Sequence, residues 1–493
     1  MVFPHTYRNE HTETITTNYT YGSWYAEHVK FKIPIKRQLL KLLKDIDGCE
    51  RSYRRDLSDT VAIKCIPTNP KYSKEIYRMK SYVEGWFNKL SIRNESFDIG
   101  SIQFGDQTLV LPPVLLGRLK SPIAKITLCV YLHLDVREQN PAEWDSDPWT
   151  LSERDAKYYG CGTASSKGPL LCWMHAIQSF NRLNFDLPIN IKFIVEFAYT
   201  LRSPELMKFL VAKKQDFFND IEYVVCNLSE WLGQKYPSIV YGTVGVLYMS
   251  LMVQKNPETD SDLSEDAKKI LDTIVNDENK ILIPHFNDYV DQVTPDEERI
   301  YESIRNFDID AVRASLPPHK QHLDKIRLLM DFWRNPSITV GEVMTCACDD
   351  PDTSIVRQDF MVKIVPRQIV EKSVTMINAH VKNAVKELDI KSKVDVVLQS
   401  SVKHWIEDIY CPLFQAAKRA TLQIYKEDPD MIREDKSRLI ITILKMVFEK
   451  PVLCLPLVSQ NCNKYRPNEF IPKKNYMEGT KLIAALIIQL GEK

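Results

Sequence analysis

The sequence has 493 residues, of which 44% are hydrophobic and 26% are charged, as is usual for a globular protein. At about 150 residues per domain, this length predicts two or three domains. Lys plus Arg and Asp plus Glu both number 65, so the formal net charge is zero. This balance excludes a nucleic acid or an anionic membrane recruited by bulk charge.

The N-terminal residues and the cysteines bear on location. The chain does not start with the basic residues and apolar run of a secretory signal. We find no apolar stretch of the roughly 18–20 residues that a membrane-spanning helix needs. The 11 cysteines have no regular spacing, which is typical of free thiols in a reducing compartment. We therefore expect a cytoplasmic protein without a membrane partner.

Helices and short apolar strands alternate along the first half of the chain. Residues 1–34 are read as an N-terminal extension, and helices are predicted at 35–47, 72–91 and 169–183 from their apolar faces. Short apolar runs rich in β-branched residues predict buried strands at 126–136, 189–199, 222–228 and 451–458. This alternation predicts an α/β domain with a mixed sheet between helices.

Between residues 248 and 399 the pattern changes. The acidic segment 256–269 is read as the start of a helix or as a linker. Alternating strands are predicted at 337–345 and 357–366, and an amphipathic helix at 372–388. The sequence therefore predicts an inserted α+β domain (248–399) between two parts of the α/β domain, 35–247 and 400–493.

Candidate site residues follow the predicted strand at 126–136. Ligands of open α/β sheets bind beyond the carboxyl ends of the strands, where "LHLDV" places His133 and Asp135. Residues two apart on a strand project to the same side, and a His backed by a carboxylate is a metal-ligand arrangement. Taken alone, the pair is also explained by a hydrogen-bonded, half-buried His at a strand end.

A longer match points to a family. "HLDV" and the segment 144–177, "WDSDPWTLSERDAKYYGCGTASSKGPLLCWMHAI", resemble the carnosine-dipeptidase and cytosolic nonspecific dipeptidase branch of the two-metal aminoacylase-type metallopeptidases. Further segments match in the same order: "LPPVLLGRL", "NKILIPHFNDYVDQVT", "WRNPS" and "NYMEGTKLIAA". The resemblance implies an α/β domain interrupted by a lid domain through which the chain forms a homodimer. It also implies two divalent ions, held by His, a bridging Asp, Glu, Asp and a late His, and a Glu as general base.

Carried over position by position, the resemblance retains His133 with Asp135 and loses the other ligand types. The position implied for the general base holds Tyr199. In the order bridging Asp, second Glu, next Asp and last His, the implied ligand positions hold Ser165, Thr200, Leu228 and Tyr465.

The implied substrate-binding positions are also altered. The lid Arg that takes a substrate carboxylate in the family corresponds to Lys363 in "VKIVP". A Gly-Gly-Ser segment corresponds to "DKS", in which Ser437 is retained. We interpret Lys363 and Ser437 as remnants of a substrate pocket.

These replacements predict a site without metal and without another cofactor. Each catalytic zinc ion needs three protein ligands and an open position, and neutral alcohols or a leucine do not supply them. Tyr465 could bind a cation only as phenolate, whose reference pKa of about 10 is raised further in an apolar pocket. We therefore expect a non-catalytic homologue that acts by binding or scaffolding, as a homodimer, with a protein partner or a small ligand in the old cleft.

Two other functions remain open. One is a dipeptidase or amidohydrolase with a rebuilt site, whose ligands would come from His175, Cys161, Cys172 or Cys226, although each of these also fits a packed core. The other is a storage or structural role. A pocket at His133 closed by Tyr199 and Tyr465 favours the inactive homologue, and an open cleft with converging His and Cys favours the rebuilt enzyme. "TCACDD" (345–350) is a weak candidate for a soft-metal clip and is read as a strand with its turn.

Overall fold

The computed structural model describes residues 36–492, except 106, 203, 260–261, 306 and 347–353. The predicted N-terminal extension, residues 1–34, lies outside the described residues. So do residues 347–350 of the "TCACDD" segment.

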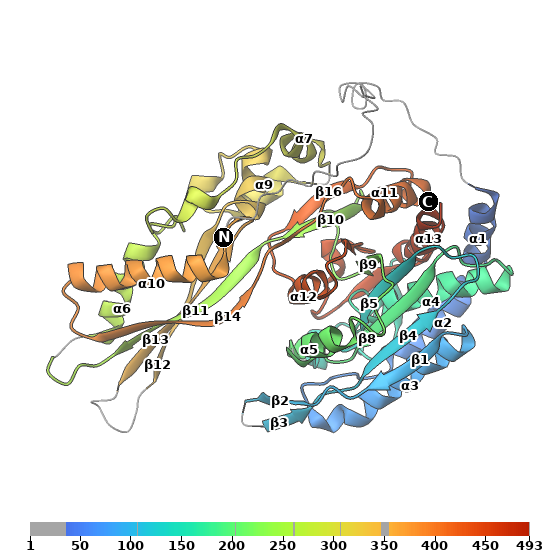
Figure 1. Cartoon of the computed structure of the whole chain (residues 1–493), viewed down its shortest axis with the longest axis horizontal. Coiled ribbons are helices and arrows are strands. Elements are labelled where there is room, and N and C mark those ends of the chain that lie inside the picture. The colour runs from blue at the N-terminus through green and yellow to red at the C-terminus, as the bar shows by residue number, and fades with distance from the viewer. Residues whose placement is uncertain are drawn as a thin grey trace. The chain divides into compact units, whose positions relative to one another are not determined.

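The larger domain is built on a nine-stranded mixed sheet (Figure 1). In spatial order its strands are β1 (Arg93–Phe97), β4 (Val114–Leu119), β8 (Asn190–Glu196), β5 (Thr127–His133), β9 (Tyr223–Cys226), β17 (Val452–Cys454), β10 (Ser238–Thr243) and β15 (Trp405–Ile406), with β16 (Asp430–Glu434) also paired to β10. The central strands β8, β5, β9 and β17 run parallel, so their carboxyl ends lie at one edge of the sheet.

Side-chain alternation along the central strands builds two cores. On β5, Leu128, Val130 and Leu132 enter the core on one face of the sheet, whereas Cys129 and Tyr131 enter the core on the other face. The first core contains residues from α1 (Arg37–Asp47), α2 (Glu50–Val61), α3 (Ser73–Lys89), α4 (Lys167–Arg182), α11 (Pro412–Tyr425) and α13 (Lys473–Leu490). The second contains residues from α5 (Pro204–Lys213), α7 (Pro295–Ser303), α9 (Lys325–Trp333) and α12 (Leu439–Phe448).

A separate antiparallel sheet has the order β12, β13, β11, β14. Its strands are β11 (Gly245–Gln254), β12 (Ser337–Cys346), β13 (Ile355–Ile364) and β14 (Lys393–Val402). Helices α6 (Leu263–Ile274) and α10 (Val370–Glu387) pack on one face and share a third core with the strands. The fold is therefore the predicted α/β domain with an inserted α+β domain, while the boundaries 248 and 399 stay a prediction.

Further short strands complete the chain. They are β2 (Ser101–Phe104) paired with β3 (Gln107–Val110), and a three-stranded sheet of β6 (Ser152–Arg154), β7 (Lys157–Tyr159) and β18 (Phe470–Pro472). β18 brings the C-terminal region beside β7, which precedes the loop that carries Ser165.

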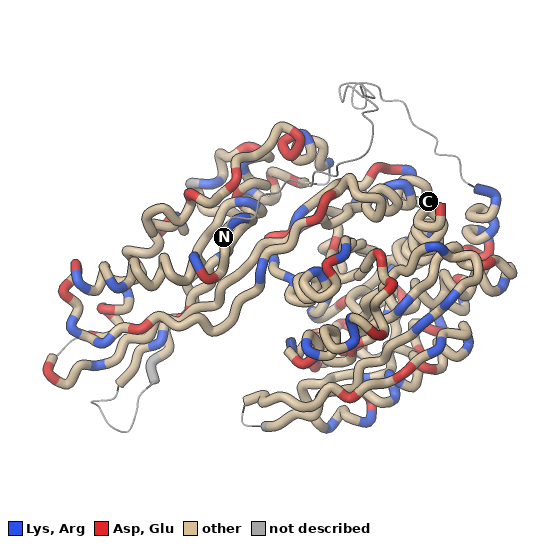
Figure 2. The backbone as a smooth tube through the Cα atoms, viewed as in Figure 1, with Lys and Arg blue, Asp and Glu red and all other residues tan. Residues whose placement is uncertain are grey.

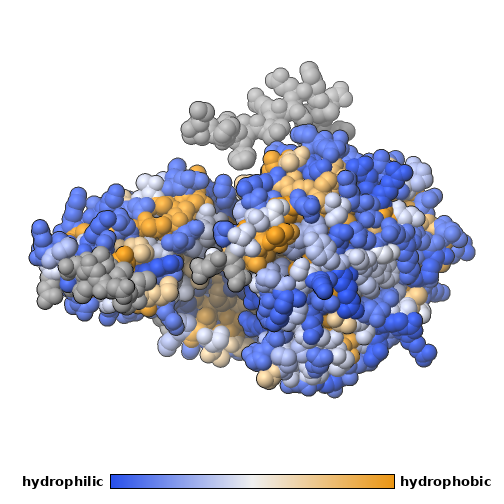
Figure 3. All heavy atoms as spheres, turned by 90° about the horizontal axis from the view of Figure 1, so that it is seen from below, coloured by the Kyte–Doolittle hydropathy of each residue, from blue (hydrophilic) through white to orange (hydrophobic). Residues whose placement is uncertain are grey.

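Neither sign of charge dominates along the chain. Acidic and basic residues are interspersed along the backbone (Figure 2), in agreement with the formal net charge of zero. The face drawn in Figure 3 is mostly hydrophilic, with hydrophobic residues in separate areas. Across the described ranges, the helices all fall short of the length and apolar character that crossing a membrane requires.

Candidate functional site

Three aromatic side chains meet at the carboxyl end of the central strands. His133 is the last residue of β5, and Tyr199 begins a 3-10 turn directly after β8, the parallel neighbour of β5. Their ring centroids are 4.3 Å apart and their planes differ by 26°. The Nε2 atom of His133 lies 3.2 Å from the hydroxyl of Tyr465, which comes from the loop before β18. Tyrosine side chains therefore contact the imidazole on one face and at its Nε2 edge.

The two tyrosines are held as neutral phenols. Burial raises the pKa of the Tyr199 phenol, and burial also raises the pKa of the Tyr465 phenol. Tyr465 has a backbone φ of +64°, a left-handed conformation that costs a bulky residue roughly 1–2 kcal/mol. Because neither phenol ionises near neutral pH, neither supplies an anionic ligand or a general base.

Asp135 is fully buried and its oxygens are already engaged. They accept the backbone N–H groups of Tyr199 (3.1 Å) and Thr200 (2.8 Å), and one lies 3.4 Å from Nδ1 of His133. Burial opposes the negative charge, but the contact with His133 and the hydrogen bond from Thr200 outweigh it and hold the pKa of Asp135 below its usual value. Asp135 therefore anchors the turn that presents Tyr199.

The loop that carries Ser165 is bound by a carboxylate that was not predicted from the sequence. Glu469 accepts the N–H groups of Gly162 (3.0 Å), Ala164 (2.9 Å) and Ser165 (2.7 Å). Burial raises the pKa of Glu469, although these N–H groups oppose the shift. The apex of the loop is neutral, and its negative partner comes from the C-terminal region.

The buried side chain of Lys464 contacts the backbone of Leu228. The Leu228 side chain is in the second core, whereas its carbonyl oxygen accepts the Nζ of Lys464 at 2.9 Å. The carbonyl of Ser229 accepts the same Nζ at 3.2 Å. Burial lowers the pKa of Lys464. Lys464 was not predicted as a site residue, although it directly precedes Tyr465.

An arginine–glutamate pair lies beside the tyrosines. Arg438 binds Glu434 through two hydrogen bonds, Nε to Oε2 at 2.9 Å and a terminal nitrogen to Oε1 at 3.1 Å. Burial opposes the charge of Glu434, but Arg438 holds its pKa below the usual value. The Arg438 guanidinium also interacts electrostatically with Tyr199 and with Tyr465.

The two proposed substrate remnants lie in different surroundings. Lys363, on β13, donates to the carbonyls of Asp331 (2.8 Å) and Phe332 (3.2 Å) near the C-terminal end of α9, and burial lowers its pKa to about 8. Lys363 thus satisfies helix carbonyls. Ser437 is half-buried in the turn before α12. A substrate role of Lys363 and Ser437 stays a prediction.

The candidates for a rebuilt metal site are dispersed in the core. His175, on α4, is fully buried, with Nε2 2.9 Å from Asp56 on α2, and burial lowers its pKa to about 4. Cys172 lies against the carbonyl of Tyr476 at 3.6 Å. Burial raises the pKa of Cys161, and the hydrogen bond with Cys454, followed by burial, raises the pKa of Cys226. In the part of the chain that the structure describes, no three His, Cys, Asp or Glu side chains are grouped so that they could hold a metal.

The donor set at His133 does not fit the two-metal centre that the resemblance implies. The implied bridging position is Ser165, a neutral alcohol, and the acidic partner of that loop is directed to backbone N–H groups. The imidazole Nε2 contacts a phenol, and the Asp135 carboxylate accepts two amides. Two ions that share a water need more anionic ligands than these residues provide.

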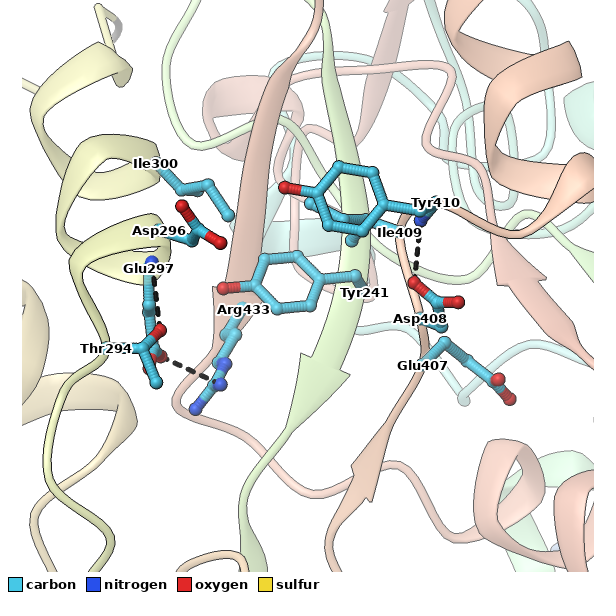
Figure 4. Close-up of a pocket in the computed structure, with 10 residues that line it drawn as sticks. All are labelled: Tyr241, Thr294, Asp296, Glu297, Ile300, Glu407, Asp408, Ile409, Tyr410 and Arg433. Atoms are coloured by element: carbon cyan, nitrogen blue, oxygen red, sulfur yellow. Dashed lines mark hydrogen bonds and ion pairs between the residues drawn. The ribbon is translucent and has the colours of Figure 1, made fainter. Parts of the chain in front are cut away.

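A cavity of about 290 Å³ lies elsewhere, between α7, β10, β16 and the segment after β15. In Figure 4 the rings of Tyr241 and Tyr410 project into this region. Its wall residue Glu297 is paired with Arg433 at 2.8 Å and also with Arg334. The ten described residues that line it include none of the predicted site residues, so it is separate from the His133 cluster.

Comparisons with known proteins agree over nearly the whole chain. A model of peptidase family M20/M25/M40 matches residues 129–489. Beta-Ala-His dipeptidase of Homo sapiens is 31% identical over 476 residues, which cover 92% of this chain and 93% of that protein. Cys-Gly metallodipeptidase dug1 of Schizosaccharomyces pombe is 27% identical over 473 residues, which cover 93% and 99%. The crystal structure of human carnosine dipeptidase 1 superposes with a TM-score of 0.80 at 29% identity and covers 93% of this chain and 100% of that one.

Proposed function

Since this chain belongs to peptidase family M20/M25/M40, we propose that it is a member that has lost hydrolysis and acts by binding or scaffolding. The observation that carries the proposal is the state of His133, whose ring contacts the neutral phenols of Tyr199 and Tyr465. A positioned general base is worth roughly 10²–10⁴-fold in rate. The position implied for that base holds Tyr199, which stays protonated near neutral pH.

A rebuilt metallodipeptidase is the second candidate, and the comparisons favour it. The similar proteins are named as dipeptidases, for Beta-Ala-His and for Cys-Gly, and the similarity covers both domains. An active member of this kind would need ligands beyond the residues that gather at His133.

Metal content and hydrolysis decide between the two candidates. The purified full-length chain is incubated with zinc or manganese, desalted, and analysed for bound metal and for hydrolysis of β-alanyl-histidine and cysteinyl-glycine. We expect far less than one metal ion per chain and no release of amino acids above the blank. The human Beta-Ala-His dipeptidase, treated identically, is the positive control. About two ions per chain together with turnover would reject the inactive homologue and support the rebuilt enzyme.

The binding role would use a second copy of the chain and the inserted domain. The edge strands β12 and β14 expose hydrophobic side chains: Val340, Val343, Met344, Val397 and Leu398. Exposed apolar residues on edge strands favour pairing with another chain. We therefore propose a homodimer through this domain, with an additional protein or small ligand at the old cleft.

The location is proposed from the thiols. The cysteines whose side chains the structure describes are all free, and most are buried. Free buried thiols are typical of a reducing compartment, and we propose the cytoplasm. Cells that express the full chain can be fractionated to test this location. Recovery of the protein in the fractions of the secretory pathway would contradict a cytoplasmic location.

A further inference from the structure

Two buried side-chain cations act on residues at the ligand positions that the family resemblance implies: Lys464 donates to the carbonyl of Leu228, and Arg438 interacts electrostatically with Tyr465. Arg438 directly precedes α12, and Glu434 is the last residue of β16; both elements are labelled in Figure 1. The two side chains are joined by two hydrogen bonds. The side chains of this pair are only 12% and 11% exposed. The guanidinium also interacts electrostatically with Tyr199 and Tyr465, so one cation acts on the cluster around His133.

The second cation belongs to the position of Leu228. The Nζ of Lys464 is held by the carbonyl oxygens of Leu228 and Ser229, at 2.9 and 3.2 Å, directly after β9. Carbonyl oxygens are hard ligands that also suit cations. Lys464 interacts electrostatically first with Glu230, and also with Glu469 and Glu434. Its positive charge therefore acts on several carboxylates, although its hydrogen bonds go to carbonyl oxygens.

Buried carboxylates require counter-charges. Asp135 lies against His133, Glu434 is paired with Arg438, and Glu469 accepts from the amide of Ser165. An unpaired buried carboxylate is strongly unfavourable, and in a metalloenzyme the bound ions supply the positive charge. Here the chain itself supplies it, through two side chains that come from the C-terminal part of the fold.

We propose that Arg438 and Lys464 are built-in counter-cations that take the electrostatic place of the two metal ions of the family. The inference rests on the proposed function. It explains how the remaining carboxylates stay in a stable core without metal. It also implies that acidic and His substitutions at the implied ligand positions (Ser165, Thr200, Leu228 and Tyr465) will not create a metal site while both cations remain. The cations would repel a divalent ion bound at these positions.

Thermal unfolding with and without divalent metal tests the inference. We compare the full-length chain with Arg438→Met, Lys464→Met and the double variant, each in EDTA and in millimolar zinc or manganese. The unfolding temperature of the unchanged chain should not depend on metal. In EDTA each single variant should unfold at least about 5 °C lower, because Arg438→Met strands the Glu434 carboxylate and Lys464→Met removes the donor to two buried carbonyls together with a nearby positive charge. Added metal should recover part of that loss, since the space then attracts a divalent ion.

Matched variants separate charge from packing. Arg438→Lys keeps the charge and should show no response to metal. Adding Glu434→Gln to Arg438→Met removes the stranded carboxylate, so stability should return and the response to metal should fall. Lys481→Met is the control for a distant lysine with little exposure, paired with Asp47 at 2.7 Å and Glu478 at 3.0 Å. It should lose stability without any response to metal.

The outcomes keep this inference distinct from the proposed function. Variants that unfold at the same temperature as the unchanged chain, or at a lower temperature with no recovery by metal, overturn the counter-cation role. If the double variant does not fold, the unfolding temperatures of the two single variants, with and without metal, are sufficient to test the inference. Metal binding and dipeptide hydrolysis by the unchanged chain reject the proposed function directly, whatever the variants do.

Discussion

His175 illustrates how one buried side chain carries a pH dependence. Its ring is fully buried, lies parallel to Tyr53 with centroids 3.7 Å apart, and contacts Asp56 through Nε2 at 2.9 Å. Burial lowers its pKa to about 4, despite the opposing carboxylate. An unfolded chain has a His pKa of about 6.5. The neutral imidazole is therefore a packed and hydrogen-bonded residue of the core. These contacts do not favour His175 as a metal ligand.

The first prediction concerns stability in acid. Between pH 6.5 and 4 the unfolded chain binds a proton at His175 that the native chain does not, so the free energy of unfolding falls as the pH falls. The contribution, present above pH 6.5, is about 3 kcal/mol and is lost as the pH falls through 4. In His175→Phe, which keeps an aromatic ring against Tyr53, the free energy of unfolding in urea should fall by about 3 kcal/mol less between pH 7 and pH 4 than in the unchanged chain. His285→Phe, at an exposed histidine, is the control. If the free energy of unfolding of His175→Phe depended on pH as in the unchanged chain, the pH dependence could not come from His175.

Individual site residues were predictable only in part. The types of side chain at Ser165, Tyr199 and Tyr465 lead to the hypothesis of a site without metal, which stays a hypothesis. The partner of the Ser165 loop is different, because Glu469 lies 304 residues along the chain from Ser165. Only folding brings that carboxylate to the loop, and no local pattern around Glu469 signals it.

At the scale of elements, a glycine at the start of α4 allows the preceding loop to pack directly against the helix. Gly168 is the second residue of α4, and a Cβ atom added there would lie 2.1 Å from the carbonyl oxygen of Thr163. The helix and the preceding loop are thus in direct backbone contact. A glycine at this position allows the loop amides to reach Glu469.

Substitution of two helical glycines tests this contact. Gly168→Ala should destabilise the protein by about 1–3 kcal/mol, because the loop has to move to relieve the clash. Gly85→Ala in α3 is the matched change, since nothing lies within 4 Å of its added Cβ. It should stabilise the protein by about 0.5–1 kcal/mol, the usual gain in a helix. Equal effects of the two substitutions on urea unfolding would contradict the close contact.

Most elements with a clear periodicity were predicted correctly. The strands expected at 126–136, 189–199 and 451–458 are β5, β8 and β17, although each is shorter than its apolar run. The runs are longer because the residues after each strand are also buried at the edge of the sheet. The segment of α12 was not assigned from the sequence. It is apolar on most of its surface, so its periodicity is weak.

At the scale of the whole molecule, the inserted domain is where association is expected. Its strand β14 is at the edge of the four-stranded sheet and exposes Val397 and Leu398. An edge strand with exposed apolar residues is costly to leave in water. This is the physical reason to expect a second copy there, in addition to the resemblance.

The oligomeric state provides the whole-molecule prediction. Light scattering of the purified chain should give twice the mass of one chain, and Leu398→Glu should give the mass of one chain, because a buried unpaired carboxylate is unfavourable in an interface. Leu40→Glu, on the exposed side of α1, is the matched control and should remain dimeric. A dimer that persists in Leu398→Glu would place the interface elsewhere.

The amino-acid sequence by itself determined the family, the α/β fold with an inserted domain, and the neutral residue types at the implied ligand positions, because motifs and apolar periodicity are local properties. Only the tertiary structure decided which side chains contact these positions. The phenol of Tyr465 against His133, the carboxylate of Glu469 at the Ser165 loop and the cations of Arg438 and Lys464 come from segments far apart in the chain. Their pairing depends on which buried charges the fold brings within hydrogen-bonding distance, and this is a property of packing that no local sequence pattern specifies.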